Sequence, residues 1–128
     1  PELHGLADQL AHVWQGLQPG LNVREFEDGA VQLHLYVGEV QPMLAAVHGP
    51  VDSVYLDGFS PSVNPEMWQL ATLQAVAALA REGTQLATWC VRKPVRDDLA
   101  RCGFDVRRAL GVPPKSHRLQ AVLHAGID

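Results

Sequence analysis

An acidic residue stands where a buried strand is expected to end. The apolar run at residues 54–56 stops at Asp57, and Gly58 breaks the pattern directly after it. A short apolar run bounded by turn residues is typical of a buried strand in an α/β sheet, and ligands of such sheets bind beyond the carboxyl ends of the strands. Asp57 is therefore our candidate catalytic residue. The alternative is that Asp57 only caps the next turn, a common role for aspartate.

The wider segment carries a more specific pattern. Residues 56–61 read Leu-Asp-Gly-Phe-Ser-Pro, and residues 64–68 read Asn-Pro-Glu-Met-Trp. This segment resembles the MnmC-type tRNA methyltransferases, whose pattern here is Leu-Asp-Gly-Phe-(Ala/Ser)-Pro followed by Asn-Pro-x-x-Trp. The resemblance runs over nearly the whole chain and includes residues 86–88, 95–96 and 103–106.

The resemblance implies methyl transfer from S-adenosylmethionine to the exocyclic amine on a modified wobble uridine of tRNA. Only a neutral amine attacks a sulfonium methyl group, so Asp57 is expected to orient the amine and to accept its proton. Phe59 and Pro61 are expected to bind substrate, with the Phe59 ring stacking on the base or bounding the amine.

The resemblance also implies a cofactor site that includes Gly38, Glu39 and Asp57. Glu39 would accept a hydrogen bond from the adenine amino group, although an acid near a helix N-terminus is explained equally well by the helix dipole. Residues 16–22 are similar to the family's Gly-Phe-Gly-x-Gly-Leu-Asn cofactor loop. We reject them as that loop, because a predicted helix precedes them and a predicted hairpin follows them. Most of the cofactor site is then expected upstream of Pro1.

Charge divides the chain unevenly. The whole chain has a net charge of −4, yet residues 92–118 hold eight basic residues and only three acidic ones. Such a segment is suited to binding phosphates, but it is also typical of a solvated helix with internal ion pairs. Under the family resemblance the basic segment 92–118 binds tRNA, with Arg96 and Arg118 as substrate-binding residues.

Hydrophobic periodicity predicts one α/β domain over residues 1–128. Residues 2–17 read as an amphipathic helix with Trp14 in the core, and Asp28-Gly29 predicts a hairpin turn. Gly83 is expected to end the second long helix. The expected later elements are strands at 22–26, 31–37, 52–57, 85–90, 104–107 and 119–124, the last antiparallel to its predecessor, and helices at 66–81 and 94–102.

The resemblance implies a Rossmann-like class I methyltransferase sheet that lacks its first two strands and its Gly-rich cofactor loop, so that residues 1–128 are the C-terminal two thirds of the domain. The complete strand order is 3-2-1-4-5-7-6, in which strand 31–37 is the third and strand 52–57 the fourth. Without the first two strands, strand 52–57 keeps an unpaired edge. Either strand 31–37 moves beside it, or a second copy of the chain pairs with it as a homodimer.

The remaining composition excludes several classes. No apolar run reaches the roughly twenty residues of a membrane helix, and the two cysteines and six histidines show no metal-binding spacing. We therefore expect a cytoplasmic protein without a metal site or a membrane partner. This fragment alone is expected to be inactive, and a degenerate, cofactor-free module that binds RNA or protein is the alternative to an enzyme.

Overall fold

The computed structural model describes residues 2–110 and 117–124. The chain divides into two compact units, Pro1–Glu39 and Val40–Asp128, and each is described by itself. The predicted single domain over residues 1–128 stays a prediction.

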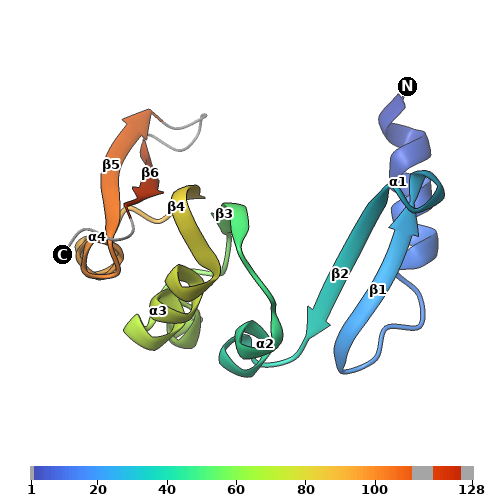
Figure 1. The fold of residues 1–128 in the computed structure, drawn as a ribbon, viewed down its shortest axis with the longest axis horizontal. Coiled ribbons are helices and arrows are strands. Elements are labelled where there is room, and N and C mark those ends of the chain that lie inside the picture. The colour runs from blue at the N-terminus through green and yellow to red at the C-terminus, as the bar shows by residue number, and fades with distance from the viewer. Residues whose placement is uncertain (1, 111–116, 125–128) are drawn as a thin grey trace. The chain divides into compact units, whose positions relative to one another are not determined.

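The first unit is a helix followed by a β-hairpin (Figure 1). Helix α1 (Glu2–Val13) precedes strands β1 (Gly20–Phe26) and β2 (Val31–Val37), which pair antiparallel over their whole length. The turn between the strands is a 3-10 segment, η1 (Glu27–Gly29). The hairpin predicted from Asp28-Gly29 is therefore confirmed, and both residues have the positive φ angles that such a turn requires.

Helix α1 is shorter than predicted, and its apolar stripe is exposed. Leu3, Leu6 and Leu10 are exposed, and Trp14, predicted to be in the core, is 51% exposed. The prediction for Trp14 is therefore wrong, and the hydrogen bonds that join the helix end to the hairpin come from a polar side chain. Arg24 on β1 donates from Nε to the carbonyl oxygen of Val13 at 2.7 Å, which satisfies an orphan carbonyl at the helix end.

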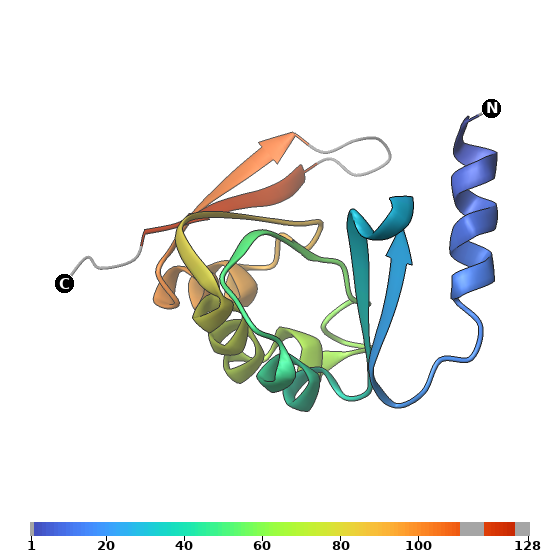
Figure 2. The same cartoon turned by 45° about the vertical axis from the view of Figure 1, so that its right-hand side comes forward.

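The second unit contains a four-stranded mixed sheet in the order β3-β4-β6-β5 (Figures 1 and 2). Strands β3 and β4 are parallel, and β6 runs antiparallel to both of its neighbours, as predicted for the last strand. The elements of this unit are α2 (Val40–Ala46), β3 (Val51–Leu56), η2 (Pro65–Trp68), α3 (Leu70–Leu79), β4 (Ala80–Thr88), α4 (Lys93–Arg101), β5 (Phe104–Leu110) and β6 (His117–Leu123).

The predicted helix over residues 66–81 is divided in the structure. The 3-10 turn η2 ends before Gln69, whose backbone is extended at φ −67° and ψ 152°. The Thr72 hydroxyl donates to the carbonyl oxygen of Glu66 at 2.6 Å and so stabilises the break. The sequence predicted that Gly83 ends this helix, but Gly83 lies within β4, with a φ angle of +88°.

One face of the sheet forms the core of this unit. Helices α3 and α4 pack on it, and the fully buried Leu73, Leu99 and Leu119 lie between helices and strands. The opposite face carries exposed side chains, among them Ser53, Tyr55 and Gln85. An α/β sheet with helices on one face leaves its other face available.

Candidate functional site

The strands align one row of residues across the sheet. Leu56 on β3 pairs with Thr88 on β4, Thr88 with Leu119 on β6, and Leu119 with Arg108 on β5. Asp57 follows this row on β3, and Arg118 comes just before it on antiparallel β6. Both residues therefore lie at the carboxyl edge of β3 and β4, and two strand spacings put their backbones about 10 Å apart.

Asp57 has an exposed side chain at this edge. The hydrogen bonds and ion pairs found in residues 2–110 and 117–124 include none to its carboxylate. The capping interaction considered as the alternative for Asp57 is thus not formed in the described structure. The two carboxylate oxygens accept no hydrogen bond within the described structure and can therefore accept hydrogen bonds from a ligand.

Two tryptophans hold the loop that follows Asp57. The indole N–H of Trp68 donates to the carbonyl oxygen of Phe59 at 2.6 Å, and that of Trp89 donates to the carbonyl oxygen of Gly58 at 3.1 Å. The two rings meet edge to face, with centroids 6.0 Å apart and planes at 82°. Sequence reasoning missed Trp89, although its place directly after the strand that neighbours β3 was a signal.

Gly58 and Phe59 differ in their surroundings, because Gly58 is closely packed and Phe59 is exposed. A Cβ atom on Gly58 would lie 2.7 Å from Cγ of Met67, so only glycine fits without displacing that side chain. Phe59 is 74% exposed, while Pro61 is half-buried. The aromatic ring is thus free to contact a ligand.

Gly38 and Glu39 directly follow β2 and close the first unit, and Glu39 is exposed. They belong to a different unit from Asp57. The rejected stretch 16–22 follows α1 and runs into β1, the first strand of the hairpin, so among the described elements no strand precedes it and no helix directly follows it. Its Asn22 is buried, and its amide donates to the carbonyl oxygens of Gln18 at 2.7 Å and Gly20 at 3.1 Å, which is a structural role.

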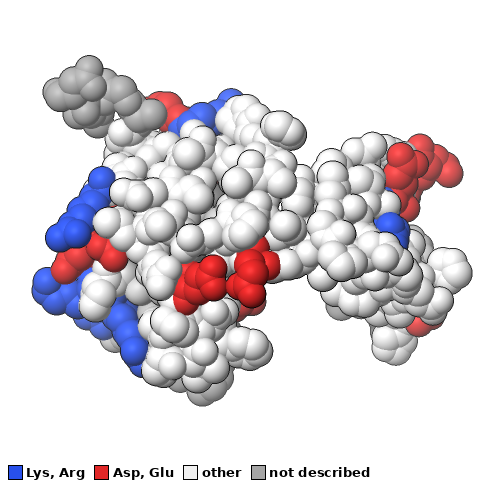
Figure 3. Space-filling model, turned by 90° about the horizontal axis from the view of Figure 1, so that it is seen from below, with Lys and Arg blue, Asp and Glu red and all other residues white. Residues whose placement is uncertain are grey.

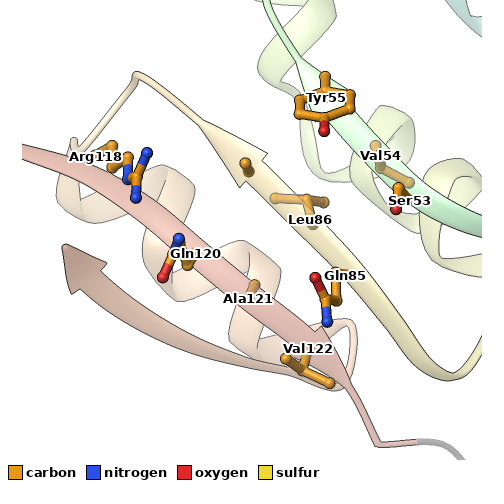
Figure 4. Close-up of a pocket in the computed structure, with 10 residues that line it drawn as sticks. Ser53, Val54, Tyr55, Gln85, Leu86, Arg118, Gln120, Ala121 and Val122 are labelled. Atoms are coloured by element: carbon orange, nitrogen blue, oxygen red, sulfur yellow. The ribbon is translucent and has the colours of Figure 1, made fainter. Parts of the chain in front are cut away.

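The two arginines predicted to bind substrate line different hollows. Arg118 lines a hollow of about 390 Å³ on the exposed face of the sheet, near Gln120 on the same strand, while Tyr55 lines it from β3 (Figure 4). Arg96 lines a second hollow, of about 550 Å³, with Asp97 and Arg108 between α4 and β5. The structure therefore places these two arginines at separate surfaces of the same unit.

Ion pairs neutralise part of the basic segment. Lys93 pairs with Asp97 at 2.8 Å, Arg101 with Asp98 at 3.6 Å, and Arg107 with Asp105 at 3.4 Å. The hydrogen bond from Lys93 lowers the pKa of the Asp97 carboxyl below its usual value. Figure 3 shows the basic side chains gathered at the left, on the side of α4, with acidic ones between them.

The other basic residues of the segment are not paired in this way. Within the described residues, no ion pair involves Arg92, Arg96, Arg108 or Arg118, and the Nε atom of Arg96 is buried without a hydrogen-bond partner. Lys115 lies outside the described residues. The four arginines are therefore the cations best able to meet an external anion.

Two further features of the described residues concern metals and membranes. No three His, Cys, Asp or Glu side chains converge on a possible metal position in residues 2–110 and 117–124. None of the helices formed by those residues has the length and apolar character needed to cross a membrane.

Comparisons with known proteins bear on the family. Residues 1–124 match the model of a family described as S-adenosyl-L-methionine-dependent methyltransferase. The tRNA 5-methylaminomethyl-2-thiouridine biosynthesis bifunctional protein MnmC of Delftia acidovorans is 52% identical over 122 residues, which are 95% of this chain and 19% of that protein. The protein of the same name from an Acidovorax species is 50% identical over 93% of this chain and 19% of its own length.

A solved structure is also similar. The crystal structure of MNMC2 from Aquifex aeolicus superposes with a TM-score of 0.71 at 27% identity, over 81% of this chain and 34% of that one. The chain thus spans about a fifth of the length of the curated relatives it matches. With the family model covering nearly all of its residues, the chain belongs to this family of S-adenosyl-L-methionine-dependent methyltransferases, which confirms the resemblance carried by the Asp57 segment.

Proposed function

We propose that this chain is part of an enzyme that methylates the exocyclic amine of the aminomethyl group on a modified wobble uridine of tRNA. S-adenosylmethionine is the methyl donor, and the product is a 5-methylaminomethyl-type uridine. The names of the relatives support the substrate class. The single observation that supports the proposed chemistry is the exposed Asp57 carboxylate. It lies at the carboxyl edge without a hydrogen bond in the described structure, beside a loop that two indole N–H groups hold in place.

Asp57 supplies the acceptor that the reaction needs. The amine nitrogen uses its lone pair to form the new N–C bond, so it must be neutral and aimed at the methyl group. A carboxylate that accepts a hydrogen bond from the amine N–H aims that lone pair, and it can take the proton when the product forms. Phe59, with its exposed ring, and Pro61 would bound the base on the same loop.

The described residues provide only part of a binding site for S-adenosylmethionine. Glu39 is an exposed acid at the end of β2, which suits the adenine amino group as a donor. Among the described elements, however, no turn with three glycines leads from a strand into a helix, the arrangement that presents backbone N–H groups to a cofactor. We therefore propose that β3, β4, β5 and β6 are the second half of a class I methyltransferase sheet, and that most of the cofactor site belongs to another part of the complete enzyme.

The tRNA would bind through the basic segment 92–118. Arg92, Arg96, Arg108 and Arg118 lack an ion pair among the described residues and sit on α4, β5 and β6 or next to them. Because an unpaired guanidinium gives up no local partner when it meets a phosphate, these four should contribute more to tRNA affinity than the paired Lys93, Arg101 and Arg107.

We also propose that β3 offers its free edge to a second copy of the chain. Within the described residues β3 pairs only with β4, while β2 pairs only with β1. Backbone donors and acceptors on an unpaired edge favour pairing with another strand. Light scattering on residues 1–128 tests this, and a monomer at high concentration would contradict it.

The function is tested with Asp57→Asn in the complete enzyme. This change removes the negative charge while keeping the shape of the side chain. Transfer of labelled methyl from S-adenosylmethionine to tRNA should fall by on the order of 100-fold or more, the usual contribution of a positioned base.

Asp52→Asn is the matched control, because Asp52 is an exposed acid on the same strand that pairs with Arg81 away from the carboxyl edge. Its activity should match that of the wild type. If Asp57→Asn also matches the wild type, Asp57 is not the acceptor. Absence of methyl transfer by the wild-type complete protein would instead favour a cofactor-free module that binds RNA.

A further inference from the structure

The loop after Asp57 is held at two consecutive peptide groups. The carbonyl oxygens of Gly58 and Phe59 accept indole N–H groups from Trp89 and Trp68, which both follow the loop in the sequence, Trp68 at the end of η2 and Trp89 directly after β4. Trp68 is only 5% exposed, and Trp89 is half-buried. The two rings also contact each other, so each supports the position of the other.

We propose that Trp68 and Trp89 are positioning residues for methyl transfer, which fix the Gly58 and Phe59 peptides and thereby hold the Asp57 carboxylate and the Phe59 ring in their working positions. The proposal rests on the proposed function of Asp57.

A restraint is needed at this point of the chain. Gly58 has no Cβ, so its backbone would otherwise visit many conformations, and the Asp57 carboxylate makes no hydrogen bond of its own in the described structure. The Phe59 ring, at 74% exposed, also lacks the packing that would orient it. The two carbonyls belong to the 58–59 and 59–60 peptide groups, which flank the Cα atom of Phe59. Their hydrogen bonds therefore orient the Phe59 side chain directly and restrain the Gly58 backbone that follows Asp57.

The same hydrogen bonds affect what the loop can recognise. The Gly58 and Phe59 carbonyls already accept hydrogen bonds from the indoles, whereas the exposed Asp57 carboxylate is a charged acceptor without a hydrogen bond in the described structure. A substrate amine would therefore be recognised through a charged acceptor, and a substrate group that cannot donate a hydrogen bond would gain nothing here.

The first test needs no substitution. In the complete enzyme, the indole N–H protons of Trp68 and Trp89 should exchange with solvent much more slowly than that of Trp14, which is 51% exposed. Exchange of the Trp89 proton as fast as that of Trp14 would overturn the proposal. This measurement also decides the case if a variant fails to fold.

The second test is Trp89→Phe in the complete enzyme, which keeps a ring but removes the N–H donor. We expect kcat to fall by about 10- to 100-fold while KM for tRNA stays unchanged, because a small misplacement of a reacting group has an effect of this size. The matched control is Trp14→Phe, which should keep the wild-type kcat. A wild-type kcat for Trp89→Phe would overturn the proposal.

A double-mutant cycle separates this proposal from the proposed function. If Trp89 acts through Asp57, then Trp89→Phe should have no further effect on the residual rate of Asp57→Asn. An equal loss in both backgrounds would show that Trp89 acts independently and would overturn the proposal. Full activity of Asp57→Asn would instead refute the role of Asp57 itself.

Discussion

Arg118 offers a quantitative test of tRNA binding. It is exposed, lies at the carboxyl edge and forms no ion pair among the described residues. Each phosphate contact contributes about 0.9 to the slope of log K against log salt for duplex nucleic acid and about 0.7 for single strands. Four unpaired arginines that each meet one phosphate would together contribute about 3 to 4 to this slope. Arg118→Gln should make the slope shallower by about 0.7 to 0.9.

The assay is fluorescence anisotropy of labelled tRNA with the complete enzyme, over salt concentrations from about 50 to 200 mM. Arg101→Gln is the matched control, since Arg101 is an exposed arginine of the same segment that already pairs with Asp98 at 3.6 Å. Its slope should change less than that of Arg118→Gln. Equal slopes for Arg118→Gln and the wild type would refute the assignment of Arg118, and a larger change in Arg101→Gln would refute the argument from ion pairing.

Three further outcomes are expected. Leu119→Ala removes a side chain with no exposed surface and should lower the free energy of unfolding by about 2–5 kcal/mol in urea titrations. Val122 is half-buried, so Val122→Ala should lower the free energy of unfolding by less. Equal decreases for the two variants would contradict the described core. Burial, with a smaller effect from Asp98, raises the pKa of the Cys102 thiol, so alkylation at neutral pH should be slower than for free cysteine and should rise as the pH increases through the raised pKa. Mass spectrometry that finds rapid labelling at pH 7 would contradict this. Calorimetry should find weak or no binding of S-adenosylmethionine to residues 1–128, and tight binding would show that these residues hold a complete site.

Local patterns predicted most of the second unit. The apolar run before Asp57 does form strand β3, and the two last strands do pair antiparallel. The break at Gln69 was not predictable, because residues 66–81 have a continuous helical pattern. It depends on side-chain hydrogen bonds of Thr72, which accepts from Gln41 on a different helix and donates to Glu66. Such tertiary contacts override local propensity.

The candidate site was predictable in part. A strand-end acid can be identified from sequence because the hydrophobic run itself ends there, and Asp57 does stand at the carboxyl edge. The role of Trp89 could not be identified in this way, since its hydrogen bond to Gly58 joins residues 31 positions apart. The separation of Arg96 and Arg118 into two hollows likewise depends on strand order, which periodicity does not encode.

The position of β6 has a consequence for how the second unit is made on the ribosome. This strand lies between β4 and β5, so among the described strands β5 gains its partner only when residues 117–123 have been synthesised. Until then β4 also lacks its neighbour on that side, and Leu86 and Phe104 lack a complete core. The nascent chain should therefore present open edges on β4 and β5 and then close the sheet in one late step. Such an interval exposes strands to wrong pairing and makes this unit a natural client for chaperones during synthesis.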